Sequence, residues 1–278
     1  MKKTYMICIC VLCLLCSLFG CSAKKESQQE SKEDAVEKNQ FEKYQFYKKE
    51  NLKRYQDYQE KHQDLSLKDI VTYVNMNKDY DFYDKIIQQN DPQSMHTLVN
   101  KYYQLPLTYE PDDLVEINDK TLSYGAKYGK HTARQIVYDD FQALVQACKQ
   151  HGFELYVCSG YRSTSWQEEI YNHMVDTYDQ ATADKTCSRP GHSEHTTGLG
   201  LDVGLDQYQF EDIVTHPSYQ WFLSQLNDYG FIIRYPSQKQ DLTGYEYEPW
   251  HIRYLGKELA KKVEKSKLTF DEYYARYF

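Results

Sequence analysis

The stretch Pro190-Gly191-His192-Ser193-Glu194-His195-Thr196-Thr197-Gly198-Leu199-Gly200-Leu201-Asp202-Val203-Gly204 determines how the rest of the chain is interpreted. It places His195 and Asp202 seven residues apart, on either side of a glycine-containing turn. Neutral imidazole and ionised carboxylate are both good zinc donors. In residues 199–204 apolar residues alternate with Asp202 and glycines, so a strand can bury one face while Asp202 points from the other. The stretch therefore predicts half of a metal site.

The second half is expected in Glu248-Pro249-Trp250-His251. A catalytic zinc takes three protein ligands and keeps one position for water, so His195 and Asp202 need a partner. His251 could complete the set, and Glu248, three residues earlier, could serve the water as general base. His192 is a rival ligand, although a histidine beside a turn needs no metal.

The two motifs together resemble a known family. Ser193-x-His195-x-x-Gly198-x-Gly200-x-Asp202 followed by Glu248-x-x-His251 is similar to the VanY-type zinc D-alanyl-D-alanine carboxypeptidases (peptidase family M15), and Ser159-Gly160-Tyr161-Arg162-Ser163 with Gln167 fits that family too. The resemblance covers roughly residues 119–278. One departure is visible, because the family usually has Ala where this chain has Gly200.

The resemblance implies a role for each motif residue. It implies that the zinc ligands are His195, Asp202 and His251. It also implies that Glu248 is the catalytic base and that Arg162 is the cation facing the negative charge that develops on the substrate. An arginine between a strand and a helix can aim its guanidinium into a cleft, where it suits a carboxylate or oxyanion. Gln167 and Ser193 are candidate substrate-binding residues, with capping or turn chemistry as the alternative for both.

The same resemblance implies an activity: removal of the C-terminal D-alanine from peptidoglycan stem peptides. An L,D-carboxypeptidase acting on tetrapeptide stems is the close alternative. A non-catalytic wall-binding lipoprotein stabilised by zinc is the alternative from another class. Glu248 distinguishes the enzyme from the binding protein, because a structural zinc site is closed by four protein ligands and this sequence offers three and a base.

Bulk composition excludes several classes of protein. The 278 residues are 27% charged and the mean hydropathy is −0.80, which describes a soluble surface rather than a membrane bundle. Loss of a leader that carries Lys2 and Lys3 changes the net charge from −8 to about −10, so a nucleic-acid partner is not expected. We expect a monomer.

The N-terminus predicts export and anchoring. Residues 1–20 form a secretory signal with lysines at the start and an apolar run, Met6 to Leu18, that is short for a membrane span. Leu18-Phe19-Gly20-Cys21 resembles a bacterial lipoprotein cleavage box, which implies lipidation of Cys21 and an extracytoplasmic protein held at the membrane. An ordinary cleaved signal is the alternative.

Two regions are expected between the signal and the catalytic domain. Residues 21–51 contain almost no aliphatic side chain and predict a flexible tether. Residues 52–117 predict an accessory region that covers the peptidase core, with a helix-to-strand passage at 65–75; wall binding is the alternative. The zinc carboxypeptidase domain is assigned to 118–278.

Within residues 118–278 the pattern predicts an α+β domain. We expect helices at 138–151, 164–172, 216–230, 255–265 and 269–274, with Gly230 ending the third. Strands are expected at 153–158, 199–204, 231–235 and 247–254, and a surface loop at 174–189. A capping box that starts at Thr164 or at Ser165 is expected to begin the second helix. The family implies a small mixed or antiparallel sheet with flanking helices around a zinc cleft, as in hedgehog and D,D-peptidases. Cys148, Cys158 and Cys187 are expected to be packing residues with free thiols. A single disulfide bond between two of them is the alternative.

Overall fold

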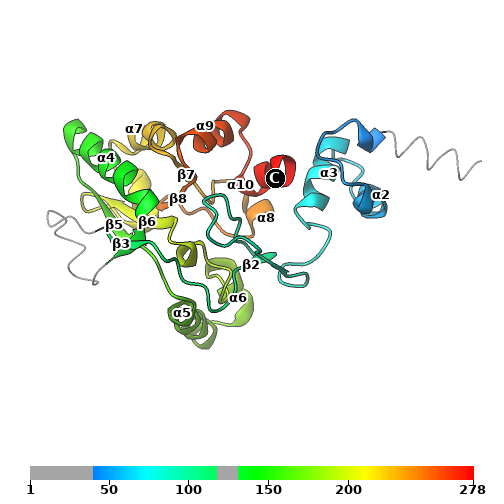
Figure 1. Cartoon of the computed structure of the whole chain (residues 1–278), viewed down its shortest axis with the longest axis horizontal. Coiled ribbons are helices and arrows are strands. Elements are labelled where there is room, and N and C mark those ends of the chain that lie inside the picture. The colour runs from blue at the N-terminus through cyan, green and yellow to red at the C-terminus, as the bar shows by residue number, and fades with distance from the viewer. Residues whose placement is uncertain (1–39, 118–130) are drawn as a thin grey trace, which may run out of the picture.

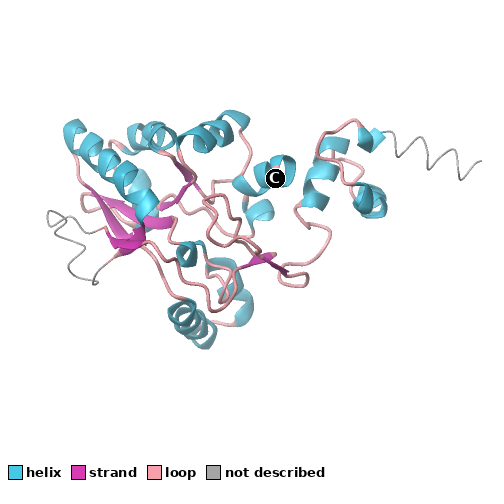
Figure 2. Ribbon diagram, viewed as in Figure 1, coloured by secondary structure: helices cyan, strands magenta, loops and turns pink. Residues whose placement is uncertain are grey.

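The computed structural model describes residues 40–117 and 131–278 (Figure 1). The expected signal segment, Cys21 and most of the expected tether lie outside these residues. Within the two described ranges, no helix has both the length and the apolar character needed to cross a bilayer. Helices surround short strands (Figure 2), which confirms the predicted α+β fold.

A four-stranded antiparallel sheet forms the centre of the domain. Its order is β5 (Leu155–Ser159), β6 (Gly200–Leu205), β8 (His251–Tyr254) and β7 (Phe231–Ile233). Strands β7 and β8 are shorter than predicted, because Pro236 follows the first closely and Pro249 precedes the second, and proline cannot donate to a ladder. The register pairs Asp202 on β6 with His251 on β8, so the sheet itself brings two predicted ligands together.

The main apolar core lies between this sheet and the helices that cover it. Helix α4 (Gln135–His151) contacts β5 and buries the predicted stripe of Phe141, Leu144, Val145 and Cys148. Gly152 ends α4 in the left-handed conformation, with φ of 102°, as the sequence predicted. Helix α7 (Tyr219–Gln225) and the 3-10 turn η5 (Leu226–Tyr229) complete this layer, and η4 (Phe210–Thr215) contacts β6.

The predicted surface loop at 174–189 is wrong. Helix α5 (Thr164–Thr177) continues past residue 174, and α6 (Gln180–Thr186) follows directly. Asp179 caps α6 by accepting from the backbone N–H of Thr182. The cap of α5 is Ser163, which accepts from the N–H of Trp166, so neither capping box proposed from the sequence starts this helix.

The N-terminal part of the described chain is a small helical unit. Helices α2 (Leu52–Lys61) and α3 (Leu67–Asn75) follow a turn η1 (Lys49–Asn51) and enclose their own apolar cluster: Phe41, Tyr55, Tyr58, Ile70, Val71 and Val74. Ser66 caps α3, which is helical throughout, so the strand predicted at its end is wrong. Because Phe41 is buried in this cluster, ordered packing begins within the segment expected as tether.

Residues 76–117 connect this unit to the peptidase core. Strand β1 (Ile87–Gln88) pairs in parallel with β2 (Tyr103–Gln104), and β3 (Leu114–Glu116) pairs antiparallel with β4 (Thr132–Arg134). The N–H of Leu105 donates to the carbonyl of Gly191 at 2.8 Å. Leu98 packs with α9 (Lys257–Ser266) and α10 (Phe270–Tyr277), so this segment and the peptidase core share one apolar cluster.

The C-terminal helix α10 also meets the N-terminal unit. Arg276 Nε donates to Thr72 Oγ1 at 2.9 Å, and α3 lies against α10 (Figure 1). The short helix α8 (Gln240–Thr243), which belongs to the peptidase core, also contacts α10. Cys148, Cys158 and Cys187 are free thiols in the described chain, and two of them are buried.

Candidate metal centre and active site

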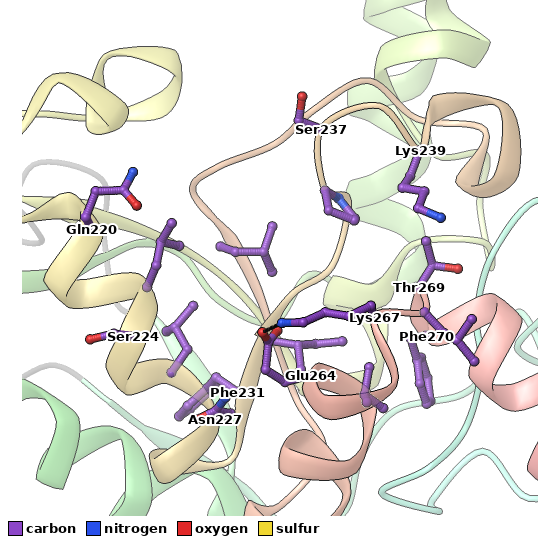
Figure 3. Close-up of a pocket in the computed structure, with 17 residues that line it drawn as sticks. Gln220, Ser224, Asn227, Phe231, Ser237, Lys239, Glu264, Lys267, Thr269 and Phe270 are labelled. Atoms are coloured by element: carbon purple, nitrogen blue, oxygen red, sulfur yellow. Dashed lines mark hydrogen bonds and ion pairs between the residues drawn. The ribbon is translucent and has the colours of Figure 1, made fainter.

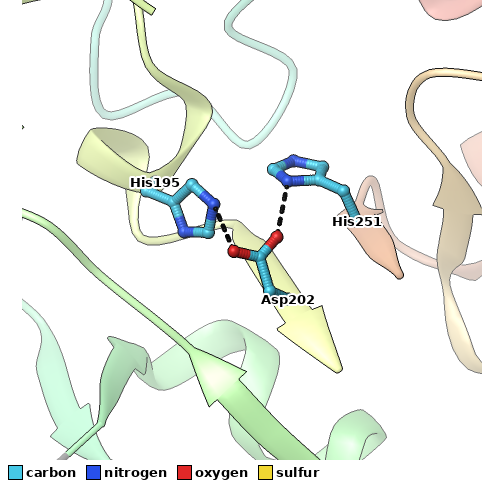
Figure 4. A group of neighbouring side chains, drawn as sticks. All are labelled: His195, Asp202 and His251. Atoms are coloured by element: carbon cyan, nitrogen blue, oxygen red, sulfur yellow. Dashed lines mark hydrogen bonds and ion pairs between the residues drawn. The ribbon is translucent and has the colours of Figure 1, made fainter. Parts of the chain in front are cut away.

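Three predicted ligands converge in the structure (Figure 4). His195 comes from the 3-10 turn η3 (Glu194–Thr197), Asp202 from β6 and His251 from the first position of β8. Their ligand atoms lie within 4.8 Å of one another, and all three residues are buried. Asp202 bridges the pair: Oδ2 is 3.2 Å from His195 Nε2, and Oδ1 is 3.0 Å from His251 Nδ1.

His195 is oriented by the backbone. Its Nδ1 lies 2.8 Å from the carbonyl oxygen of Gly160, so Nδ1 carries the proton and Nε2 presents a lone pair toward Asp202. Burial, reinforced by the charge of Arg162, lowers the pKa of His195 to about 4. The ring is therefore neutral at pH 7, the form in which histidine binds metals.

Asp202 and His251 carry the complementary charges of the group. Burial alone would raise the pKa of Asp202, but His195 and His251 hold it well below its usual range, so the carboxyl is ionised. Burial lowers the pKa of His251, and the contacts with Asp202 and Glu194 outweigh it and raise this pKa to about 9. Carboxylates thus flank both ring nitrogens of His251.

This donor set fits a catalytic zinc ion. Two imidazole nitrogens and one carboxylate converge from three elements, which leaves a position for water. His192, the rival ligand, points elsewhere, because its Nδ1 donates to the carbonyl of Asn100 at 2.7 Å. Burial lowers the pKa of His192 to about 4.

Glu248 lies beside the three candidate ligands without joining them. Its Oε2 is 3.7 Å from His251 Nδ1, and its side chain is 17% exposed in the wall of the cavity. Burial raises the pKa of Glu248 to about 7. A carboxyl group poised near neutrality is suited to accept a proton and to return it.

Arg162 reaches the same place from the end of β5. Its Nη2 lies 3.7 Å from Asp202 Oδ2, and its Nη1 donates to Gln167 Oε1 at 3.0 Å. Gln167 is buried, and its Nε2 donates to the carbonyl of Ser188 at 2.9 Å. Both ends of the amide are therefore engaged within the protein, which makes Gln167 a support for the guanidinium.

A cavity of about 210 Å³ brings these groups to one surface. Its wall contains the three candidate metal ligands together with Arg162, Gln167, Ser193 and Glu248. Every residue that the sequence predicts for the site therefore lines this cavity. A larger groove of about 900 Å³ adjoins the cavity and shares Thr186, Tyr245, Glu248 and Trp250 with it. The site thus opens into room for an extended substrate.

A further hollow of about 640 Å³ lies between α7, β7 and the two C-terminal helices (Figure 3). It shares no lining residue with the cavity of the metal group. Glu264 and Lys267 form an ion pair across its edge, and much of the remaining wall is apolar. The chemistry predicted from the sequence therefore lies outside this hollow.

Comparison with known proteins identifies the family. The profile of VanY, D-alanyl-D-alanine carboxypeptidase, matches residues 130–257. YodJ of Bacillus subtilis strain 168, a carboxypeptidase by name, is 40% identical over 189 residues, which are 67% of this chain and 69% of YodJ. The chain belongs to the VanY family of D-alanyl-D-alanine carboxypeptidases.

Two solved structures support the VanY fold of the chain. LdcB, an LD-carboxypeptidase whose structure addresses peptidoglycan recognition, is 38% identical with a TM-score of 0.64, over 69% of this chain and 91% of LdcB. A variant of the D,D-pentapeptidase VanY from a VanB-type resistance cassette, solved with Zn(II), is 31% identical with a TM-score of 0.55. That match covers 65% of this chain and 98% of the VanY chain. The protein is a metallopeptidase of this family.

A buried charge cluster next to the VanY-type site was not predicted from the sequence. Glu194 Oε1 accepts from Arg234 Nε and from Arg253 Nη1, both at 2.7 Å. Arg234 also binds Asp271 of α10, with Nη1 2.5 Å from Oδ2. Burial would raise the pKa of Glu194, and the two arginines hold it well below its usual range. One signal was available, because Arg253 follows His251 by two residues and so shares its face of the strand.

Proposed function

We propose that the protein is a zinc-dependent carboxypeptidase that removes the C-terminal D-alanine from peptidoglycan stem peptides ending in D-alanyl-D-alanine. One observation carries the proposal: His195, Asp202 and His251 converge on a cavity that also presents Glu248 and Arg162. Membership of the VanY family supports the reaction, and the Zn(II) complex of a VanY relative supports the metal.

His195 Nε2, an oxygen of Asp202 and His251 Nδ1 would hold the zinc ion. When bound, zinc supplies Lewis-acid chemistry, because it polarises the scissile carbonyl and makes water more acidic. Glu248 is placed to take the proton from the attacking water and to return it to the amine of the leaving D-alanine. A carboxylate with a near-neutral pKa can serve both transfers.

Arg162 is assigned to the negative charge that develops on the carbonyl oxygen. Gln167 holds one nitrogen of the guanidinium, so its contribution to substrate binding is made through Arg162. Ser193 lines the cavity and is assigned to the peptide backbone of the substrate. These roles fit a site that binds the peptide terminus and the reacting carbonyl together.

An L,D-carboxypeptidase acting on tetrapeptide stems is the second candidate. Two observations favour it: LdcB has the higher identity and TM-score of the two solved relatives, and the adjoining groove has room for a side chain longer than that of alanine. Both activities release D-alanine, and they differ in the residue that precedes the cleaved bond.

Muropeptides of defined length test the proposal. The purified, zinc-loaded protein is incubated separately with pentapeptide and tetrapeptide muropeptides, and the products are identified by mass spectrometry. Loss of one D-alanine from the pentapeptide alone supports D,D specificity, and loss from the tetrapeptide alone supports the L,D candidate. Binding of both with no loss from either would contradict a carboxypeptidase and favour a wall-binding role.

We further propose that the protein acts outside the cytoplasm as a lipoprotein anchored at Cys21, with a tether before residue 40 and a monomeric catalytic unit. The sequence of residues 1–21 supports this, and these residues lie outside the described structure. Cys21→Ala is expected to move the protein from the membrane fraction to the soluble fraction. An unchanged membrane fraction would contradict lipidation at this cysteine.

A further inference from the structure

Glu194 presents one carboxylate oxygen to each of two different partners. Oε1 is occupied by Arg234 and Arg253, at 2.7 Å each. Oε2 points the other way and lies 3.5 Å from His251 Nε2. Both Oε2 and His251 Nε2 are buried, and neither has another hydrogen-bond partner in the described chain. Their separation makes each atom a candidate partner for the other.

The opposite nitrogen of the same ring faces the metal group. His251 Nδ1 is 3.0 Å from Asp202 Oδ1 and 3.7 Å from Glu248 Oε2. Metal binding to a histidine releases one proton and leaves a neutral imidazole, so a ring that donates from Nε2 presents a lone pair on Nδ1. Metal-bound histidines commonly donate their second N–H to a carboxylate, which fixes the tautomer and the orientation of the ring.

We infer that Glu194 is a positioning residue: it holds the Nε2–H of His251 and thereby presents Nδ1 to the metal. This inference rests on the proposed zinc centre and adds a residue that does not touch the metal. The motif around His195 thus supplies one ligand through its imidazole and orients a second ligand, 56 positions away in the sequence, through the preceding glutamate.

Neighbouring residues fix the position of the Glu194 side chain. Arg253 Nη2 donates to the carbonyls of Met95 and Thr97, at 3.1 and 2.8 Å. Arg234 is held by Asp271 on α10, and Asn100 Nδ2 donates to the same aspartate at 2.7 Å. The carboxylate of Glu194 is thus fixed by two arginines that are themselves fixed by the 95–100 segment and by the C-terminal helix.

The missing side chain of Gly200 leaves the space for this contact. A Cβ at residue 200 would lie 3.2 Å from Glu194 Cβ and 3.2 Å from His251 Nε2, tighter than ordinary van der Waals contact. Gly200 pairs with Arg253 across β6 and β8, two pairs away from Asp202 and His251. The departure from alanine at this position therefore falls where glutamate and imidazole approach each other.

Glu194→Gln tests the inference, with Asp271→Asn as its matched control. Both changes remove one negative charge from the same arginine cluster, and only the first alters the group that faces His251. Because the arginines retain the remaining oxygen, the amide N–H₂ of Glu194→Gln would meet the Nε2–H of His251, two donors facing each other. Zinc affinity is measured by competition with a chelator of known affinity.

The expected result is a zinc affinity lowered about 10- to 100-fold in Glu194→Gln, the range typical for lost partners of metal-bound histidines. Asp271→Asn should keep an affinity within about threefold of the parent protein, although both variants should lose stability. An unchanged affinity in Glu194→Gln, or equal losses in the two variants, would overturn the inference.

The tautomer of His251 provides a measurement that needs no variant. In the ¹⁵N spectrum of the zinc-loaded parent protein, His251 should carry its proton on Nε2 and show Nδ1 as the metal-bound nitrogen. The reverse assignment would overturn the inference, even if Glu194→Gln failed to fold. Absence of near-stoichiometric zinc in the parent protein is a different failure, because it would overturn the proposed metal centre itself.

Discussion

Replacing Arg162 by methionine is expected to lower kcat for D-alanine release by about 10²–10³-fold while zinc stays bound. The side chain is 18% exposed, so solvent screens its charge only weakly. Its Nη2 lies 3.7 Å from Asp202 Oδ2, which shows how closely the guanidinium approaches the reacting centre. Near that separation, two unit charges interact by about 4 kcal/mol at an effective dielectric constant of about 20.

That energy sets the upper limit of the effect. A loss of about 4 kcal/mol corresponds to about 10³-fold in rate, because each 1.36 kcal/mol is a factor of ten. The assay is D-alanine release at saturating substrate, with the zinc content of each protein measured first. Arg162→Lys keeps the charge and loses the fork that Gln167 holds, so its rate should lie between those of the parent and Arg162→Met.

The support of Arg162 by Gln167 can be tested in the same assay. Gln167→Ala should lower the rate in the parent and have little further effect in Arg162→Met, because the two residues act together. A kcat for Arg162→Met within threefold of the parent, at equal zinc content, would refute the role given to this arginine.

Two further predictions concern stability. The pKa of His192 falls from 6.5 in the unfolded chain to about 4 in the fold. Its contribution to the free energy of unfolding is therefore fully present above pH 6.5, and about 3 kcal/mol of it is lost as the pH falls toward 4. His192→Asn should remove that part of the pH dependence in urea unfolding, and identical pH profiles would contradict it. Phe141→Ala should cost about 3–5 kcal/mol, since the ring is fully buried. The control Trp166→Ala, at a side chain 53% exposed, should change stability by about 0.5 kcal/mol or less, and similar losses in both would contradict the assignment of the core.

The elements with strong local signals were predictable from the sequence. The stripe of α4 and the glycine that ends it were found because a 3.6-residue period and a left-handed cap are local features. The sequence predicted that Asp202 and His251 bind the same metal ion, but not that they lie opposite each other on neighbouring strands. The register that places them opposite each other depends on contacts between strands 49 residues apart in the sequence.

The parts that were missed depend on tertiary packing. Helix α6 has little apolar period of its own and buries chiefly Ala183 against α5, so its sequence resembles a polar loop. The cluster of Glu194, Arg234, Arg253 and Asp271 combines charged residues from four separate segments. Each of these charged residues, considered alone, is expected at the surface. Their burial becomes favourable only when the fold pairs them with one another.

The measurement that tests the central claim most directly compares Glu248→Gln with the parent protein at equal zinc occupancy. Glu248 lies beside the candidate ligands, with Oε2 3.7 Å from His251 Nδ1, and its proposed task is proton transfer. The variant should keep zinc, fold and muropeptide binding, and it should lose D-alanine release by about 10²–10⁴-fold, toward the upper end because one carboxylate serves both transfers. Undiminished release by Glu248→Gln would contradict this mechanism.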